Sequence, residues 1–196
     1  MSTELTFRLI TLAFLVTVFT LSGYFRRRAD RQGGAMRTAE GRRAVTFVRL
    51  YGLLAILPLL AYLINPDWMA WARLALPDWV RWLGVMLMAV LVPLVYWVLA
   101  SLGNNISPTQ ATRQGHQLVT HGPYRYVRHP LYSTGATALL ALALVTGLWW
   151  IAVAMLPAIV FLVWRTPHEE ARLIETFGDA YRAYAHRTGR FLPKLF

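Results

Sequence analysis

The sequence predicts an all-α polytopic membrane protein with about five transmembrane helices, and three observations support this. Hydrophobic residues make up 57% of the 196 residues and charged residues only 15%, which is below the roughly 25% of soluble domains. The chain holds eight tryptophans, and its mean hydropathy is +0.43. Its apolar residues fall into separate runs near the roughly 20 residues that a helix needs to cross the hydrocarbon core. We expect a single integral-membrane domain over residues 1–196.

The five predicted helices follow from apolar segments at 5–24, 44–64, 80–101, 131–146 and 148–164. The first segment is followed by the arginine run 26–28 and shows no small-residue cleavage site, so we interpret it as a helix rather than a signal peptide. The last two are short and are separated only around Gly147, which predicts a tight hairpin that need not span completely. The first three helices occupy residues 1–101, and the polar motifs occupy residues 102–196.

The basic residues predict an orientation in the membrane. Seven of the 20 lie within 26–43, three within 103–130 and six from residue 165 onward. Five crossings would place these regions on one side, which the positive-inside rule makes cytoplasmic, with the N-terminus outside and the C-terminus inside. The stretch 65–82, with four tryptophans, is expected at the opposite interface. The excess of arginine over lysine indicates a GC-rich prokaryote, and hence its inner (cytoplasmic) membrane.

Several classes of function are excluded or disfavoured by composition. The absence of cysteine rules out disulfides, thiolate metal sites and cysteine nucleophiles. The formal net charge is +11, but the arginines flank apolar segments, where lipid and topology explain them better than nucleic acid does. No histidine pair has helical metal-ligand spacing, so we expect no metal. No G-x-G-x-x-G motif is present, which excludes a soluble nucleotide-binding methyltransferase. The sequence does not indicate an oligomeric state.

Polar residues that can do chemistry gather in the loop before the fourth segment. The stretch "HGPYRYVRHPLYSTG" at 121–135 contains two arginines, two histidines and three tyrosines. Its glycines and prolines prevent a continuous helix, and such irregular backbone near a membrane is tolerated where it lines a cavity. An alternative is that Arg125, Arg128 and His129 are interfacial cations contacting phospholipid headgroups.

A second group of polar residues follows the hairpin. Thr166, Pro167 and Glu169 form a capping-box pattern, which predicts that a helix begins here. Apolar and aromatic residues then recur at helical spacing to residue 184, so we expect a cytoplasmic amphipathic helix that folds back over the hairpin and bends or breaks at Gly178. The hairpin would return this glutamate and its neighbour Glu170 to the face that holds the loop. Helix capping alone explains the first glutamate, but it explains the second less well.

These motifs together carry a resemblance. The stretches "LGNNIS" at 102–107, "GHQLVTHGPYRYVRHPLY" at 115–132 and "RTPHEEARLIETFGDAYRAYAHRTGRFLPKLF" at 165–196 resemble the isoprenylcysteine carboxyl methyltransferase family of integral-membrane methyltransferases, especially its short five-helix prokaryotic members. The resemblance covers about half of the chain, in the right order. The chain departs from the family at Ile106, often aromatic there, and in the small-residue run 133–137, both of which bear on the acceptor pocket.

The resemblance implies S-adenosylmethionine as the cofactor. Tyr124 and the backbone up to Gly122 would hold the adenosine, Arg128 and His129 would meet the methionyl carboxylate or position the loop, and the two glutamates would take ribose hydroxyls or the amino group. The complete expected cofactor-binding set is His116, Gln117, Leu118, Val119, Gly122, Tyr124, Arg128, His129, Pro130, Tyr132, Glu169 and Glu170.

The expected acceptor is a carboxylate, such as that of an isoprenylated cysteine or a related isoprenoid or lipid acid, entering from the membrane. A carboxylate is already ionised near neutral pH, so catalysis would consist mostly of positioning. We expect Arg165 to hold the acceptor carboxylate and Asn105 to add a polar contact, although interfacial snorkelling also explains Arg165. Open alternatives are other acceptors, a sterol C14-type reductase that binds NADPH, a non-catalytic membrane scaffold, or a haem or metal protein.

Overall fold

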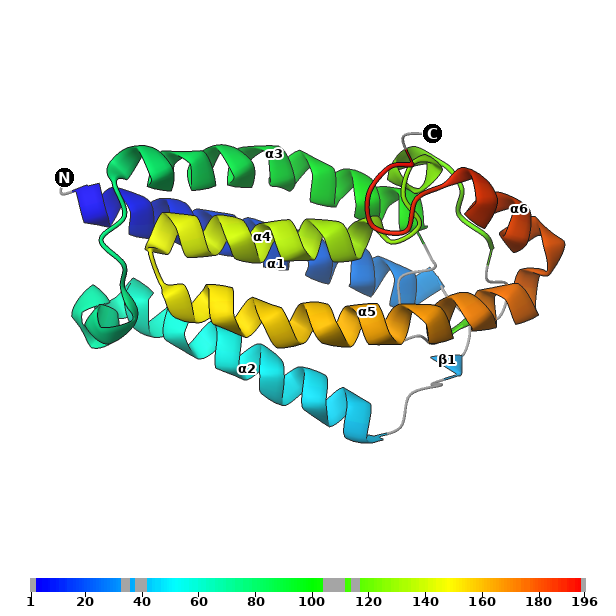
Figure 1. Ribbon diagram of the computed structural model, residues 1–196, viewed down its shortest axis with the longest axis horizontal. Helices are drawn as coiled ribbons and strands as arrows, with labels where there is room; N and C mark the ends of the chain where they lie inside the picture. The colour runs from blue at the N-terminus through cyan, green and yellow to red at the C-terminus, as the bar shows by residue number, and fades with distance from the viewer. Residues whose placement is uncertain (1–2, 33–35, 38–41, 104–111, 114–116, 195–196) are drawn as a thin grey trace.

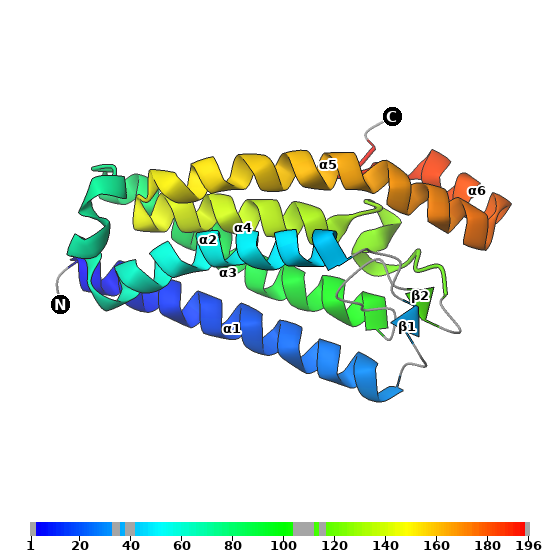
Figure 2. The ribbon, with the colours of Figure 1, turned by 90° about the horizontal axis from the view of Figure 1, so that it is seen from below.

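The computed structural model describes residues 3–32, 36–37, 42–103, 112–113 and 117–194. Five long helices run along the long axis of the molecule (Figures 1 and 2), and a short sixth lies at one end. The helices are α1 (Thr3–Gln32), α2 (Arg42–Ile64), α3 (Asp78–Leu102), α4 (Pro130–Thr146), α5 (Trp149–Phe177) and α6 (Asp179–Arg187). The connections include the 3-10 helices η1 (Pro66–Ala72) and η3 (Gly122–Arg125), and the two-residue strands β1 (Met36–Arg37) and β2 (Thr112–Arg113), which pair antiparallel. The predicted all-α class is confirmed.

Among the described residues, three helices are long and apolar enough to cross a membrane, namely α1, α3 and α5. The apolar part of α2 at Leu50–Ile64 and the whole of α4 are shorter. The 17 residues of α4 extend over about 25 Å, against a hydrocarbon thickness of roughly 30 Å. The chain is therefore a membrane protein, and the count of five crossings stays a prediction.

The closest packing in the bundle joins α3 to α4. Gly84 makes it possible, because a Cβ at this position would lie 2.7 Å from Val145 Cγ2 and 3.0 Å from the carbonyl oxygen of Ala141. The main apolar core surrounds this contact and draws on α1, α2 and η1 as well. A smaller buried cluster lies further along α1 and α3, and consists of Phe25, Ala29, Val95 and Leu99.

The chain reverses between α4 and α5 through Gly147 and Leu148. Gly147 has φ +69°, and its N–H donates to Ala143, which ends α4. A Cβ here would lie 2.8 Å from the carbonyl oxygen of Leu74, so both the backbone conformation and the close approach require glycine. The two helices lie against each other along most of α4 (Figure 2).

The prediction that a new helix begins at Thr166 is wrong, because α5 continues through this residue and Pro167 to Phe177. The Thr166 hydroxyl donates backwards to the carbonyl of Leu162 at 2.6 Å instead of capping a helix start. The break predicted at Gly178 is confirmed: this residue has φ +57°, and its N–H closes the end of α5 on Ile174. The amphipathic tail is therefore the end of α5 followed by α6.

The two ends of the bundle differ in composition. One end, the site end, gathers the C-terminal end of α1, the paired strands, η3, α6 and the end of the chain (Figure 1). The described residues of all three basic regions belong to this end. The other, the tryptophan end, holds η1, the start of α3 and the turn between α4 and α5, with Trp68, Trp71 and Trp79 exposed. The direction in which the bundle crosses the membrane stays a prediction.

Candidate functional site

The site end is built by pairing two segments about 60 residues apart in sequence. Residues 188–191, which we call the strap, lie along residues 126–129. The backbone N–H groups of Arg128 and His129 donate to the carbonyls of Gly189 and Arg190 at 2.8 and 3.1 Å, and Gly189 N–H donates to Tyr126 at 3.3 Å. Immediately after this pairing Pro130 begins α4, where its missing N–H is not needed.

Glu170 is the centre of a charged cluster beneath the strap. One of its oxygens accepts hydrogen bonds from Arg128 Nε at 2.8 Å and Arg190 Nε at 3.3 Å, and lies 3.4 Å from His129 Nε2. The other accepts from Arg190 Nη2 at 2.5 Å. The residue is only 8% exposed, and removing one partner from such a buried group leaves an uncompensated charge. The cluster therefore ties the loop, α5 and the strap together.

Arg128 extends this connection to α6. Its Nη1 donates to the carbonyls of Ala185, at 2.7 Å, and Thr188. Two backbone carbonyls at the end of α6 are thereby held by the same guanidinium that pairs with Glu170. The hydrogen bond with Glu170 also raises the pKa of Arg190, so this second arginine partner stays charged.

Glu169 makes a separate contact with α4. Its carboxylate accepts a hydrogen bond from the Tyr132 hydroxyl at 2.7 Å. The ring of Tyr132 stacks on His129, with centroids 5.3 Å apart and an interplanar angle of 4°. Phe191 of the strap contacts the same histidine, with centroids 6.0 Å apart. His129 is thus held by aromatic contacts as well as by its approach to Glu170.

Three tyrosines line the packing between η3 and α6. The Tyr184 hydroxyl donates to the carbonyl of Tyr124 at 2.7 Å, and the ring of Tyr181 lies 5.9 Å from that of Tyr184. Burial raises the pKa of Tyr124 and of Tyr181, and raises that of Tyr184 to about 12. All three phenols are therefore protonated at neutral pH and available as donors.

Gly122 fixes η3 against α3. It has φ +60°, and a Cβ added there would collide with the side chain of Ser101 and lie 3.2 Å from Trp97 Nε1. Only glycine satisfies both the left-handed backbone and this close approach. Gly122, predicted as a cofactor-binding residue, is therefore required by the backbone conformation and by the packing of η3 on α3.

The structure brings together five of the predicted site residues: Arg128, His129, Tyr132, Glu169 and Glu170. Tyr124 and Pro130 lie beside them in η3 and at the start of α4. Residues 117–119 form an irregular segment in which Gln117 is exposed and the next two residues are half-buried. The predicted residues Asn105 and His116 lie outside the described residues.

Arg165 lies on α5, just over one helical turn before Glu170 in the chain. It is half-buried, and its guanidinium carbon is 5.9 Å from the ring centroid of Phe161. Leu162, Arg165 and Glu169 are spaced so that they share one face of the helix. Along this face Arg165 therefore lies between Glu169, which accepts a hydrogen bond from Tyr132, and the apolar part of α5.

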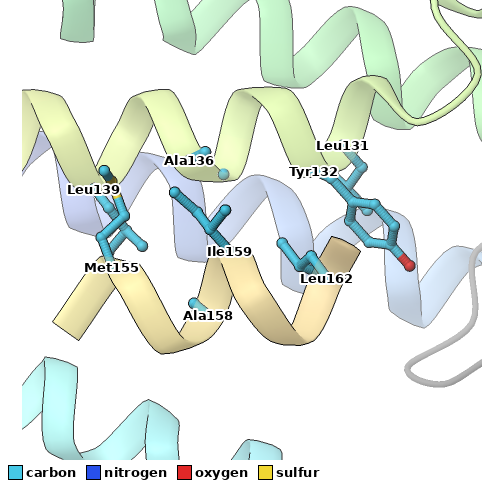
Figure 3. A pocket seen from close by; sticks show the side chains of 9 residues that line it. Leu131, Tyr132, Ala136, Leu139, Met155, Ala158, Ile159 and Leu162 are labelled. Carbon is cyan, nitrogen blue, oxygen red and sulfur yellow. The ribbon is translucent and has the colours of Figure 1, made fainter. Parts of the chain in front are cut away.

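An apolar groove lies between α4 and α5, with a volume of about 490 Å³ including its open side (Figure 3). The small residues Gly135, Ala136 and Ala158 leave this space, and Leu139 and Met155 bound it on the side away from the charged cluster. Tyr132 lines the opposite end, with its hydroxyl directed out of the groove (Figure 3). The groove therefore ends at a residue that stacks on His129 of the charged cluster.

Sequence reasoning missed Arg190 and the structural role of the strap. The tail motif included these residues, but nothing in their spacing connected them to Glu170. Their position depends on the pairing of Val127 with Gly189, which has no local signal. Tyr181 and Tyr184 were recognised only as parts of an amphipathic helix.

Comparison with known proteins bears on this arrangement. A family model described as phospholipid methyltransferase matches residues 79–180, just over half of the chain. A solved structure of a eukaryotic intramembrane Ras methyltransferase, ICMT (isoprenylcysteine carboxyl methyltransferase), shares the fold with a TM-score of 0.54 at 20% identity. The match covers 79% of this chain and 53% of that one, so the chain spans about half the length of that structure. A search of curated protein sequences found no match.

Proposed function

The chain belongs to the phospholipid methyltransferase family, and from this premise we propose that it transfers a methyl group from S-adenosylmethionine to an acceptor held in the membrane. One observation carries the proposal: Tyr132 stacks on His129 of the charged cluster and also lines the apolar groove. Its hydroxyl donates to Glu169, and its ring lines the space between α4 and α5. A charged, water-soluble donor and a lipid-borne acceptor need such a junction, because they arrive from different solvents.

The residues of the site end fit the donor in chemical type. The donor has a carboxylate, an amino group and ribose hydroxyls, and when bound it supplies a methyl group on a positively charged sulfur. Arg128 and Glu170 already satisfy each other, so we assign them the holding of the loop and the strap. The buried hydroxyl of Tyr181 has no hydrogen-bond partner in the described part of the chain. This unmet hydroxyl supports the view that the site takes a polar ligand.

We assign the acceptor to the groove, with its polar group at the Tyr132 end. Arg165 lies one turn beyond the groove residue Leu162 and one turn before Glu169. A guanidinium there suits a carboxylate, which it holds with two hydrogen bonds. The proposed acceptor is therefore an isoprenoid or lipid carboxylic acid, such as an isoprenylated cysteine, with its chain among the apolar residues of α4 and α5.

The protein's contribution to such a reaction is positioning. An ionised carboxylate needs no general base at neutral pH. Holding the acceptor oxygen in line with the methyl carbon and the sulfur can lower the barrier by about 7 to 11 kcal/mol in favourable cases. In this proposal the apolar lining of the groove keeps the acceptor in surroundings of low polarity.

The orientation that we propose puts the site end in the cytoplasm, where the donor is made. The chain has no cysteine, so single cysteines introduced at positions 28, 125 and 187 report their own side. We expect a membrane-impermeant maleimide to label all three only from the cytoplasmic side, and a cysteine at position 71 only from the opposite side. Labelling of position 125 from outside the cell would contradict this orientation.

The proposed activity is tested by ligand binding to the purified chain in detergent. Isothermal titration with S-adenosylhomocysteine should show binding, and titration with NADPH should show none. Binding of NADPH without binding of S-adenosylhomocysteine would indicate a reductase instead of a methyltransferase. An absence of both signals at millimolar ligand would remove the support for an S-adenosylmethionine-dependent reaction.

A further inference from the structure

Tyr181 on α6 presents an unusual buried group. The residue is 2% exposed, and its hydroxyl oxygen, closed off from solvent, finds no hydrogen-bond partner within the described ranges. Leaving a buried polar group unpaired costs about 1 to 3 kcal/mol, and native proteins hold few such groups. The hydroxyl therefore calls for a partner that the described part of the chain does not supply.

Tyr184 provides the contrast within the same helix. It lies three residues further along, is buried to a similar degree, and its ring contacts that of Tyr181. Its hydroxyl is satisfied, because it donates to the carbonyl of Tyr124 at 2.7 Å. Two neighbouring tyrosines thus share one environment, but only one of them has its hydrogen bond.

The position of Tyr181 directs it toward the charged cluster. Residues four apart lie on one face of a helix, and Ala185, four residues after Tyr181, gives its carbonyl to Arg128. The charges of Glu170 and Arg128 both act on the Tyr181 phenol. The unpaired hydroxyl therefore belongs to the side of α6 that faces the candidate site.

A trapped water explains the hydroxyl less well. A buried water needs two to four polar partners. Glu170 and Arg128 are engaged with each other, with Arg190 and with backbone carbonyls, and the Tyr184 hydroxyl is engaged with Tyr124. With these described groups engaged, we take the partner of the hydroxyl to be a polar ligand that enters the site.

We propose that Tyr181 is a contact residue for the methyl donor, and that its hydroxyl forms a hydrogen bond with a polar group of the bound donor. The proposal rests on the proposed function. Because the hydroxyl is closed off from solvent, the proposal includes a shift of α6 at the helix break at Gly178, which has φ +57°. The hydroxyl can donate or accept, which suits a ribose hydroxyl, an amino group or a carboxylate.

The experiment compares Tyr181→Phe with its matched control Tyr184→Phe in the full-length chain in detergent. Affinity for S-adenosylhomocysteine is measured by isothermal titration, and thermal unfolding is measured without ligand. We expect Tyr181→Phe to bind about three- to tenfold more weakly, as for the loss of one hydrogen bond, with an unliganded Tm that is unchanged or higher. Tyr184→Phe should lower the unliganded Tm and keep the affinity within about twofold.

Repeating the titrations with 5′-methylthioadenosine, which lacks the amino-acid part, locates the contact. An equal loss for both ligands places it on the nucleoside, and a loss confined to S-adenosylhomocysteine places it on the amino-acid part. Unchanged affinity of Tyr181→Phe, or an unliganded Tm lowered as in the control, would overturn the proposal while leaving the proposed function intact. If the wild-type chain binds no S-adenosylhomocysteine, the proposed function fails, and this proposal fails with it.

Discussion

Each end of the bundle contains a glutamate held by two arginines, and the two clusters differ in what surrounds them. At the tryptophan end, Glu4 accepts hydrogen bonds from Arg73 at 2.7 Å, Arg81 at 3.0 Å and the Tyr62 hydroxyl at 2.6 Å. At the site end, Glu170 accepts from Arg128 and Arg190. The chemistry of the two clusters is nearly the same, so the charged groups alone do not identify a functional site.

The surroundings separate the two clusters. The Glu4 cluster lies beside the main apolar core, and Arg81 also donates to the carbonyl of Val145 at 2.8 Å and stacks on Phe7. The Glu170 cluster holds a loop and the strap, next to an apolar groove and an unpaired buried hydroxyl. The first cluster joins helices that are already packed, and the second joins a loop, α5 and the strap, where we propose that the methyl donor binds.

The largest effect is expected from Glu170→Gln. The change leaves Arg128, whose side chain is 12% exposed, without its carboxylate partner. Unfolding free energy should fall by about 3 kcal/mol, the lower part of the range for a broken buried pair, because Arg190 is 45% exposed. S-adenosylhomocysteine should bind more than about tenfold more weakly, since the loop and the strap are released. Chemical denaturation and isothermal titration measure the two effects, and wild-type affinity in a destabilised variant would contradict this view of the cluster.

Arg81→Ala is the corresponding change at the tryptophan end. It removes the pairing with Glu4 and the bond to Val145, and should destabilise the chain by about 3 kcal/mol as well. Affinity for S-adenosylhomocysteine should stay within about twofold at temperatures where the variant is folded. A loss of affinity as large as that of Glu170→Gln would show that the two ends are coupled and would break the comparison.

Arg165→Ala separates acceptor positioning from donor binding. We expect S-adenosylhomocysteine affinity within about twofold of wild type, and methyl transfer at saturating donor reduced about 10- to 100-fold, because the acceptor loses its alignment. Arg182→Ala on α6 is the control, because the Arg182 side chain is 62% exposed and its guanidinium pairs with the exposed Asp179 at 2.7 Å. The assignment is wrong if Arg165→Ala abolishes donor binding.

Gly122→Ala should have a smaller effect, on stability. The new Cβ meets Ser101, and alanine must adopt φ +60°. We expect a loss of about 1 to 3 kcal/mol in unfolding free energy, as for other residues held in unfavourable backbone conformations. Gly23→Ala, in the middle of α1 with no other atom near its Cβ, is the control and should be neutral or stabilising. Equal stability of the two variants would contradict the close packing of η3 on α3.

Five of the described helices were largely predictable, because α1 to α5 each contain an apolar run that ends near charges, glycine or proline. The break at Gly178 was predictable because glycine weakens a helix interior. The helix start expected at Thr166 was not correct, since a threonine that caps a helix and one that bonds back to the preceding turn have the same local sequence. The structure distinguishes the two cases, because the Thr166 hydroxyl donates to the carbonyl of Leu162 and α5 continues to Phe177.

The site was predictable in part. The hairpin between α4 and α5 indicated that Glu169 and Glu170 return to the loop that holds Arg128 and His129, and the structure brings these residues together. The role of Arg190 was not accessible, because it follows from a pairing between residues 127 and 189. The Glu4 cluster was missed for a similar reason. Glu4, Tyr62 and Arg81 come from three different helices, and the position of Arg73 depends on the 3-10 helix η1 that precedes it.

The central claim is that the groove between α4 and α5 delivers a lipid-borne acceptor to the donor at the Glu170 end, and labelled-methyl transfer tests it most directly. Wild-type chain, Gly135→Leu and Gly52→Leu are incubated with methyl-labelled S-adenosylmethionine and a total lipid extract of the source cell. Both glycines lie in helices with no atom within 4 Å of an added Cβ, but only Gly135 lines the groove. We predict that wild type and Gly52→Leu label a lipid product, and that Gly135→Leu binds S-adenosylhomocysteine normally but labels none. Equal labelling by all three chains, or label that appears only in water-soluble products, would contradict the account.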